Sequence, residues 1–234
     1  MLCPNPQCQQ PVRTPEVECV VCGTFLGYPN VRVARSDFEL AVLRERYLGA
    51  EEDAEKRGCG SVFRSFVDAM RTSRAVVCRS LKIAAQFVLS DDPLYSTYYK
   101  GVGRDRRVDL APIDDDRRAT DVLLFPSYFE HIVFAALSLD GVGTKNYGNC
   151  SLVLKEMAIE SRASVFEKNS VTFCREAALG VGRPLPAGHR AAWSQRHELA
   201  GVKLGLTPRF NHAEIIIPSH SAFPSIQNPR IRLH

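Results

Sequence analysis

Four cysteines near the amino terminus restrict this chain more than any other feature of its sequence. Cys3 and Cys8 are separated by four residues, Cys19 and Cys22 by two, and ten residues lie between the two pairs. Each pair can present two thiolates from one turn, and the intervening loop can bring the pairs together as a tetrahedron. The first thirty residues hold too few apolar side chains to stay folded without a metal. The spacing therefore predicts one structural zinc ion, bound by Cys3, Cys8, Cys19 and Cys22 in a ribbon-like knuckle.

The sequence leaves open both the presence of the metal and the role of the knuckle. Without a metal, the four cysteines would be unrelated thiols, and their paired spacing argues against this alternative. Zinc ribbons serve both nucleic-acid binding and protein docking, and neither a Lys/Arg cluster nor a diagnostic aromatic pattern lies between these ligands. We expect a structural or docking role.

The composition is that of a globular chain with a sizeable core. Its 234 residues, 45% of them hydrophobic, suffice for one ordinary domain and an appendage. No apolar run reaches about eighteen residues and no export signal is present, so we expect no membrane association, a cytoplasmic location and reduced cysteines. The net charge of +4 is small and arginines alternate with acids, which favours a solvated surface over a nucleic-acid-binding stripe. The oligomeric state is left open.

Hydrophobic periodicity predicts an α+β chain in three segments. Residues 1–30 form the zinc ribbon, residues 31–72 a helical connector and residues 73–234 the main α+β domain. Ser36 is the expected cap of a helix that ends at Gly58. Further helices are expected at 62–71, 81–89 and 191–204, and strands at 75–78, 151–154, 163–166, 171–174 and 214–217. Periodicity does not decide between helix and strand for the apolar run 131–139, and we favour a helix there.

Two common kinds of enzyme site find no support. Gly-Val-Gly begins at Gly101, Gly141 and Gly180, but none extends to a full phosphate-binding fingerprint and no Gly-Lys-Ser/Thr loop exists. The four cysteines outside the knuckle lie in no nucleophile motif, so we interpret them as small core residues. Doubly wound dinucleotide folds, P-loop enzymes and hydrolases are therefore set aside.

Residues 188–197 are dense in hydrogen-bond donors and include the only tryptophan, Trp193. This segment could clamp phosphates or an acceptor. A helix with its basic face outward and Trp193 in the core is the alternative that we favour.

The carboxyl-terminal part of the chain resembles ADP-ribosyltransferases. Residues 211–218, Asn-His-Ala-Glu-Ile-Ile-Ile-Pro, and Phe-Pro-Ser-Ile at 223–226 are similar to the catalytic-glutamate segment of this superfamily, especially in bacterial toxins that modify DNA. Tyr147-Gly148, the strand at 151–154, Arg162-Ala163 and Asn169-Ser170 look like segments of other bacterial members. The resemblance implies a split, mixed β-sheet that binds NAD, with the glutamate opening a late strand.

The resemblance also assigns residues to NAD. Glu214 takes the catalytic position, and the family places a His or Arg on its first strand to hold NAD. Arg79, just after the strand at 75–78, is our first choice for that residue, and His131 is the second. Tyr147, Asn169 and Ser170 are further expected cofactor contacts, whereas the tyrosines at 95, 98 and 99 could stack on the nicotinamide or base or simply pack.

A carboxylate suits this chemistry for a physical reason. Cleavage of the bond between nicotinamide and ribose passes through an oxocarbenium-like centre, which a nearby negative charge stabilises. The simpler interpretation of Glu214 is a solvated acid that opens an edge strand. Interior packing is likewise the simpler interpretation of His131.

The sequence thus predicts an ADP-ribosyltransferase-like enzyme that cleaves NAD and transfers ADP-ribose to a protein or nucleic-acid acceptor, as bacterial toxins or defence effectors do. Two alternatives stay open. One is a non-enzymatic adaptor whose zinc ribbon recognises a partner. The other is a nucleic-acid-binding regulator, for which the excess of arginine over lysine is a hint, since guanidinium groups suit phosphates.

Overall fold

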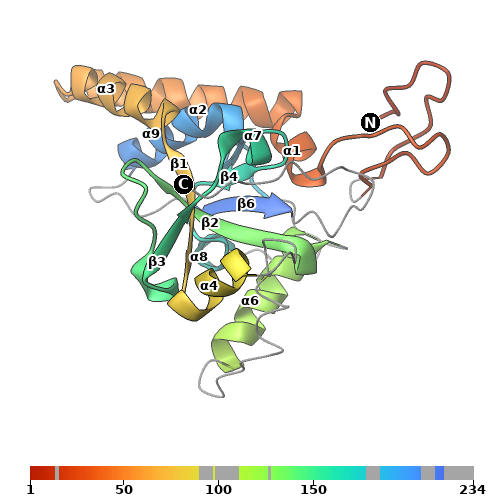
Figure 1. Cartoon of the computed structure of the whole chain (residues 1–234). Coiled ribbons are helices and arrows are strands. Elements are labelled where there is room, and N and C mark those ends of the chain that lie inside the picture. The colour runs from red at the N-terminus through yellow and green to blue at the C-terminus, as the bar shows by residue number, and fades with distance from the viewer. Residues whose placement is uncertain are drawn as a thin grey trace.

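The structure is a computed structural model that describes residues 1–13, 16–89, 97, 111–125, 128–177, 185–206 and 214–218. It is an α+β fold with a cysteine knuckle at its amino terminus. Figure 1 shows the knuckle projecting beside α1 (Pro29–Ala34), a twisted sheet in the middle of the molecule, and helices on both sides of that sheet. Within the described residues no helix is both long and apolar enough to span a membrane.

One six-stranded sheet forms the centre of the fold. Its strands are β1 (Arg74–Arg79), β2 (Ile132–Ser138), β3 (Cys150–Val153), β4 (Ser164–Phe166), β5 (Arg190–Ala192) and β6 (Glu214–Pro218). They lie in the order β3-β1-β2-β6-β4-β5, and the five pairings are all antiparallel. The split, mixed sheet that the resemblance implies is therefore not what the described strands form.

The prediction of a helix at 131–139 is wrong, because residues 132–138 form the strand β2. A short 3-10 helix, η2 (Phe129–His131), precedes this strand. β2 is an interior strand with buried residues on both faces, including Ile132 and Val133. A strand covered on both sides carries a continuous apolar run instead of an alternating one, so its periodicity resembles that of a buried helix.

Three helices cover one face of the sheet: α2 (Asp37–Lys56), α3 (Gly60–Arg71) and α9 (Arg196–Leu206), drawn together in Figure 1. The predicted cap of α2 is confirmed, since the Ser36 hydroxyl accepts a hydrogen bond from the Glu39 amide. Gly58 follows the last turn with φ +72°. Leu43, Phe63 and Leu199, one from each helix, share the main core with the sheet. The segment predicted as a connector thus supplies two helices to this core.

The other face of the sheet carries a second apolar cluster. It joins α6 (Ala111–Leu124), the sheet and α8 (Ser170–Glu176) through Leu124, Ile132, Phe166 and Cys174. α4 (Leu81–Leu89) follows β1. The short 3-10 helix η3 (Lys145–Tyr147) precedes β3, and α7 (Glu156–Ile159) follows β3.

Two more predicted elements require correction. Residues 171–174 belong to α8 and not to a strand, because the Asn169 side chain accepts hydrogen bonds from the amides of Val171 and Thr172 and so starts a helix. The α-helix predicted at 191–204 begins only at Arg196. Residues 191 and 192 belong to the strand β5, and residues 193–195 form a short 3-10 helix, η4 (Trp193–Gln195).

Candidate metal centre and functional site

The knuckle cysteines have the geometry of a zinc site. Their four Sγ atoms all lie within 4.8 Å of one another. The Cys3–Cys22 and Cys8–Cys19 sulfur pairs are 3.6 and 3.7 Å apart. A tetrahedral zinc ion with bonds of about 2.3 Å to four thiolates separates those sulfurs by about 3.8 Å. The four residues therefore fit a single structural zinc ion.

Short backbone turns hold these ligands in place. The amide of Cys3 donates to the Gln10 carbonyl at 2.8 Å, and the amide of Cys8 donates to the Asn5 carbonyl at 3.0 Å. On the second turn, Gly23 adopts φ +70° and its amide donates to the Cys19 carbonyl. The Thr24 hydroxyl, 3.1 Å from the Cys22 sulfur, lowers the pKa of that thiol to about 6, which favours the thiolate that zinc binds.

Arg32 on α1 fastens the knuckle to the rest of the molecule. Its Nη1 donates to the carbonyls of Glu16 at 2.5 Å and Gly27 at 2.9 Å, and its Nη2 lies 3.4 Å from the Arg13 carbonyl. The other side of α1 is buried against the sheet, where Asn30 donates to the Arg162 carbonyl and the Ser164 hydroxyl, both at 2.9 Å. The metal centre is thus linked through α1 to β4.

Glu214 begins β6, which lies between β2 and β4. Its partners across the ladder are Ala136 on one side and Phe166 on the other. The interpretation of Glu214 as an acid on an edge strand is therefore wrong. We call the end of the sheet that holds Glu214, Phe166 and Arg190 the Glu214 end.

Arg79 and Tyr147 lie toward the opposite end of the sheet. Val76, not Arg79, pairs with Ala136, so Arg79 is about 10 Å farther along β1 and two strands away from Glu214. Burial lowers the pKa of Arg79, and its guanidinium donates to the Cys78 carbonyl. Tyr147 precedes Gly148, where a Cβ atom would lie 2.1 Å from the Arg79 carbonyl carbon.

His131 immediately precedes β2 and lies at the Arg79 end as well. Its Nδ1 is buried and has no hydrogen-bond partner among the described residues. The structure thus brings Arg79, Tyr147 and His131 toward one end of the sheet, and it does not bring them to Glu214. Tyr95, Tyr98, Tyr99 and the segment 223–226 lie outside the described residues.

Asn169 and Ser170 follow β4 and lie toward the Glu214 end. Asn169 uses its side-chain oxygen to cap α8, at 3.1 Å from the Val171 amide, and Ser170 is completely buried. Both residues therefore have a structural task, whatever else they contact.

A buried ionic network at the Glu214 end was missed by the sequence analysis. Glu39 of α2 accepts hydrogen bonds from the Gly188 amide and from Arg190 Nε, both at 2.7 Å. Glu167, just after β4, lies 2.8 Å from both Arg46 Nη1 and His189 Nδ1. Burial alone would raise the pKa of Glu167, but His189 and Arg46 outweigh it and the pKa is lowered. No local pattern could reveal these pairs, since Glu39 and Arg190 are 151 residues apart.

Lys203 of α9 lies close enough to influence this network. It is only 3% exposed, and burial lowers its pKa to about 8, against the opposing field of Glu167. The cluster therefore holds two carboxylates and several cations in a region with little water.

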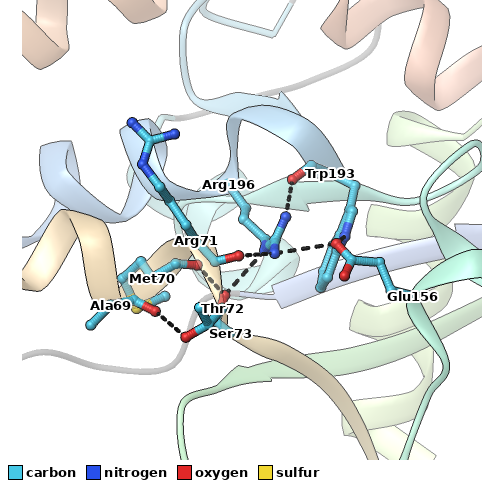
Figure 2. A network of polar contacts seen from close by, with 8 residues as sticks. All are labelled: Ala69, Met70, Arg71, Thr72, Ser73, Glu156, Trp193 and Arg196. Carbon is cyan, nitrogen blue, oxygen red and sulfur yellow. Dashed lines mark hydrogen bonds and ion pairs between the residues drawn. The ribbon is translucent and has the colours of Figure 1, made fainter.

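The donors of residues 188–197 serve mainly the fold, as Figure 2 shows for Arg196. The guanidinium donates to the Ser73 hydroxyl at 3.2 Å, to the Trp193 carbonyl at 3.0 Å and to the Arg71 carbonyl, and it stacks 4.2 Å from the centre of the Trp193 ring. Glu156 lies 3.3 Å away and also accepts the indole N–H at 2.8 Å. Arg196 is 6% exposed, so it is not a clamp for phosphates. The expectation of Trp193 in the core is confirmed.

Comparison of the sequence with protein-family models and with curated proteins found no match.

Proposed function

We propose that this chain is an ADP-ribosyltransferase-like enzyme in which Glu214 stabilises the positive charge that develops on ribose as NAD is cleaved. The observation that carries the proposal is the place of Glu214, at the first position of an interior strand between Ala136 and Phe166. A carboxylate at the start of an edge strand is common, because water solvates that position. A carboxylate at the start of a central strand is less common, and it favours a functional role for the charge. The motif around Glu214 supports the same role through its resemblance to the catalytic-glutamate segment.

The chemistry needs a fixed negative charge beside the reacting sugar. As the bond to nicotinamide lengthens, positive charge grows on C1′ and the ring oxygen, and a preorganised carboxylate lowers the energy of that state. At the same end of the sheet, the ion pair of Glu39 and Arg190 supports a rigid backbone, since Arg190 and Glu214 both pair with Phe166. Arg79, His131 and Tyr147 remain the residues that we propose for the distal parts of NAD, toward the other end of the sheet.

The zinc ion has a structural task in this proposal. Four thiolates fill a tetrahedral coordination shell and leave no position for a substrate. Cys3, Cys8, Cys19 and Cys22 would hold the ion, and the ion would hold the knuckle in shape.

Nicotinamide release from NAD by the purified full-length protein tests the proposal. The Glu214→Gln variant keeps the size of the side chain and removes its charge, so we expect the rate to fall about 100-fold or more. Glu160→Gln, at an exposed position after α7, is the matched control and should keep the wild-type rate. Equal rates for wild type and Glu214→Gln, or an inactive wild-type protein with zinc bound, would contradict the proposal.

Protein docking by the knuckle is a second candidate function, favoured by the exposed apolar residues at its tip. Val20 and Val21, between Cys19 and Cys22, are 80% and 65% exposed. Residues 1–28 contain Arg13 as their only Lys or Arg against Glu16 and Glu18, and a zinc ion with four thiolates adds negative charge, so a nucleic-acid partner is disfavoured. A variant with both Val20→Ser and Val21→Ser should keep its zinc and bind a purified protein partner at least tenfold more weakly. Unchanged affinity would rule out docking through this tip.

A further inference from the structure

We propose that the free edge of β3 is a docking site for an extended, acidic peptide segment of a partner protein, which adds a strand to the sheet. The inference goes beyond the proposed function and depends neither on NAD nor on Glu214. β3 is the outermost strand in the order β3-β1-β2-β6-β4-β5, and in the described part of the chain only β1 pairs with it (Figure 1).

The register shows which backbone groups of β3 face outward. β1 and β3 are antiparallel, and the amide of Leu154 donates to the Ala75 carbonyl at 2.9 Å. Residues along such a strand point their amide and carbonyl groups alternately toward one neighbouring strand and away from it. Ser151 and Val153 therefore direct their N–H and C=O groups away from β1. Among the described residues no strand accepts these groups, and an extended peptide satisfies them by forming a ladder.

Exposed apolar side chains lie along the same edge. Val153, Val142 and Leu139 are 43%, 47% and 51% exposed. Gly141, next to Val142, approaches β3 so closely that a Cβ atom there would lie 3.5 Å from the Val153 side chain. The loop after β2 thus brings apolar surface to β3, where alternate side chains of an added strand can pack. This combination of free backbone groups and apolar side chains favours a peptide over a nucleic acid.

The charge of the edge determines the charge of its partner. Continuing the register of β1 and β3 by two residues places Lys155 opposite Arg74. Two like charges at facing positions of neighbouring strands destabilise a sheet. Lys145 adds a third cation before the start of β3. None of these three side chains forms an ion pair with a described residue.

The acidic side chains near this edge have other partners. Asp140 accepts hydrogen bonds from the Ser138 hydroxyl at 2.7 Å and from the Val142 amide at 2.9 Å. Glu156 lies 3.3 Å from Arg196 in the network of Figure 2. Carboxylates of a partner therefore supply the charge that the edge lacks. A second copy of the chain is a poorer occupant, because its own β3 edge brings the same cations.

Binding of a synthetic peptide to the zinc-loaded full-length protein tests the proposal. The probe has a core of alternating Val and Thr, two Glu at each end and a fluorescent label whose anisotropy reports binding. We expect saturable binding that weakens at least threefold when the salt concentration rises from about 0.05 to 0.5 M. The same peptide with Lys in place of Glu should bind at least tenfold more weakly.

The sharpest variant changes one outward amide. Val153→Pro removes an N–H that points away from β1 and leaves the bonds between β3 and β1 in place, which an edge strand tolerates. We expect it to weaken binding at least tenfold. Val153→Thr, the matched control that keeps the amide, should bind within threefold of the wild type. N-methylation of the peptide amides that face β3 should abolish binding to the wild type.

Several outcomes would overturn the proposal. These are equal affinity of the wild type and Val153→Pro, unchanged binding of the N-methylated peptide, and no saturable binding up to about 1 mM peptide. A wild-type dimer in analytical ultracentrifugation that Val153→Pro dissociates would assign the edge to a second copy instead. Displacement of the peptide by a single-stranded oligonucleotide would assign it to nucleic acid. If thermal unfolding shows that Val153→Pro does not fold, the N-methylated peptide decides.

Discussion

The buried side chain of Arg196 connects several elements of the fold through hydrogen bonds. Its guanidinium joins the end of α3, the residues before β1 and the start of α9 through the Arg71 carbonyl, the Ser73 hydroxyl and the Trp193 carbonyl (Figure 2). The planar fork of arginine matches these directions, and the single ammonium group of lysine does not.

Arg196→Lys should therefore lower the free energy of unfolding by about 2 kcal/mol, because acceptors inside the protein lose their donors. Urea denaturation monitored by circular dichroism measures this change. Arg57→Lys is the control, since Arg57 lies at the exposed end of α2 and pairs with the exposed Asp53. That substitution should change the stability by less than about 0.5 kcal/mol. A loss for Arg196→Lys no larger than for Arg57→Lys would contradict our account of the network.

His197 makes the stability of the fold depend on pH. Burial, with Arg71 and Arg196 nearby, lowers the pKa of this imidazole to about 4, so the folded protein keeps it neutral while the unfolded chain takes up a proton near pH 6.5. The unfolded state thus binds more protons between those values, and stability must fall as the pH falls through this window.

Between pH 7 and pH 5 the His197 contribution to the free energy of unfolding should decrease by up to about 2 kcal/mol. Urea denaturation at both pH values measures it, and His197→Gln should remove most of the decrease. A wild-type difference that persists in full in His197→Gln would assign it to other groups, such as Glu167.

At the scale of elements, α9 approaches α2 and α3 closely because it carries Gly201 at the contact. A Cβ atom at Gly201 would lie 3.0 Å from the Val67 side chain, 3.1 Å from that of Phe63 and 3.2 Å from that of Tyr47. Gly49, on the exposed side of α2, has no atom within 4 Å of the same position.

Gly201→Val should therefore destabilise the protein by about 1–3 kcal/mol through overpacking, although valine has the higher helix propensity. Gly49→Val, the same chemical change at an open position, should be neutral or slightly stabilising. Thermal unfolding of the two variants compares them directly. Equal effects would mean that the helices can separate without cost.

The short strands show why some elements were misassigned. β5 spans the residues Arg190–Ala192, which favour helix by composition, but its ladder to β4 and the bond from Arg190 to Glu39 select the strand. Propensity over so few residues is smaller than the energy of those tertiary contacts. α2 and β1 were predicted correctly because each carries a cap or a compact apolar run within its own sequence.

At the scale of the whole molecule, the metal centre and the sheet are joined through α1. Arg32 binds carbonyl groups of the knuckle, and Asn30 of the same helix binds Arg162 and Ser164 beside and within β4. Loss of zinc should therefore weaken the body of the protein as well as the knuckle.

Chelation of zinc should lower the melting temperature of the wild-type protein, and Arg32→Met should reduce that shift because the connection is cut. The variant should keep one zinc ion and become more sensitive to trypsin after Arg13, whose carbonyl Arg32 holds in the wild type. Differential scanning fluorimetry, elemental analysis and limited proteolysis measure these three effects. Arg35→Met, at the exposed end of α1, is the matched control. An equal chelation shift in both variants would show that α1 does not couple the two parts.

The sequence by itself determined the four-cysteine cluster that fits a zinc ion and the long helices. Cys3, Cys8, Cys19 and Cys22 meet within 4.8 Å because ligand spacing acts over a few residues, and Ser36 and Gly58 bound α2 for the same local reason. Only the tertiary structure decided that β2 is a strand, that β6 lies inside the sheet, and that Glu167 lies 2.8 Å from His189. These features depend on pairing between segments that are distant in the sequence. The energies of those contacts exceed local propensity, and the contacts produce no periodic pattern in the sequence.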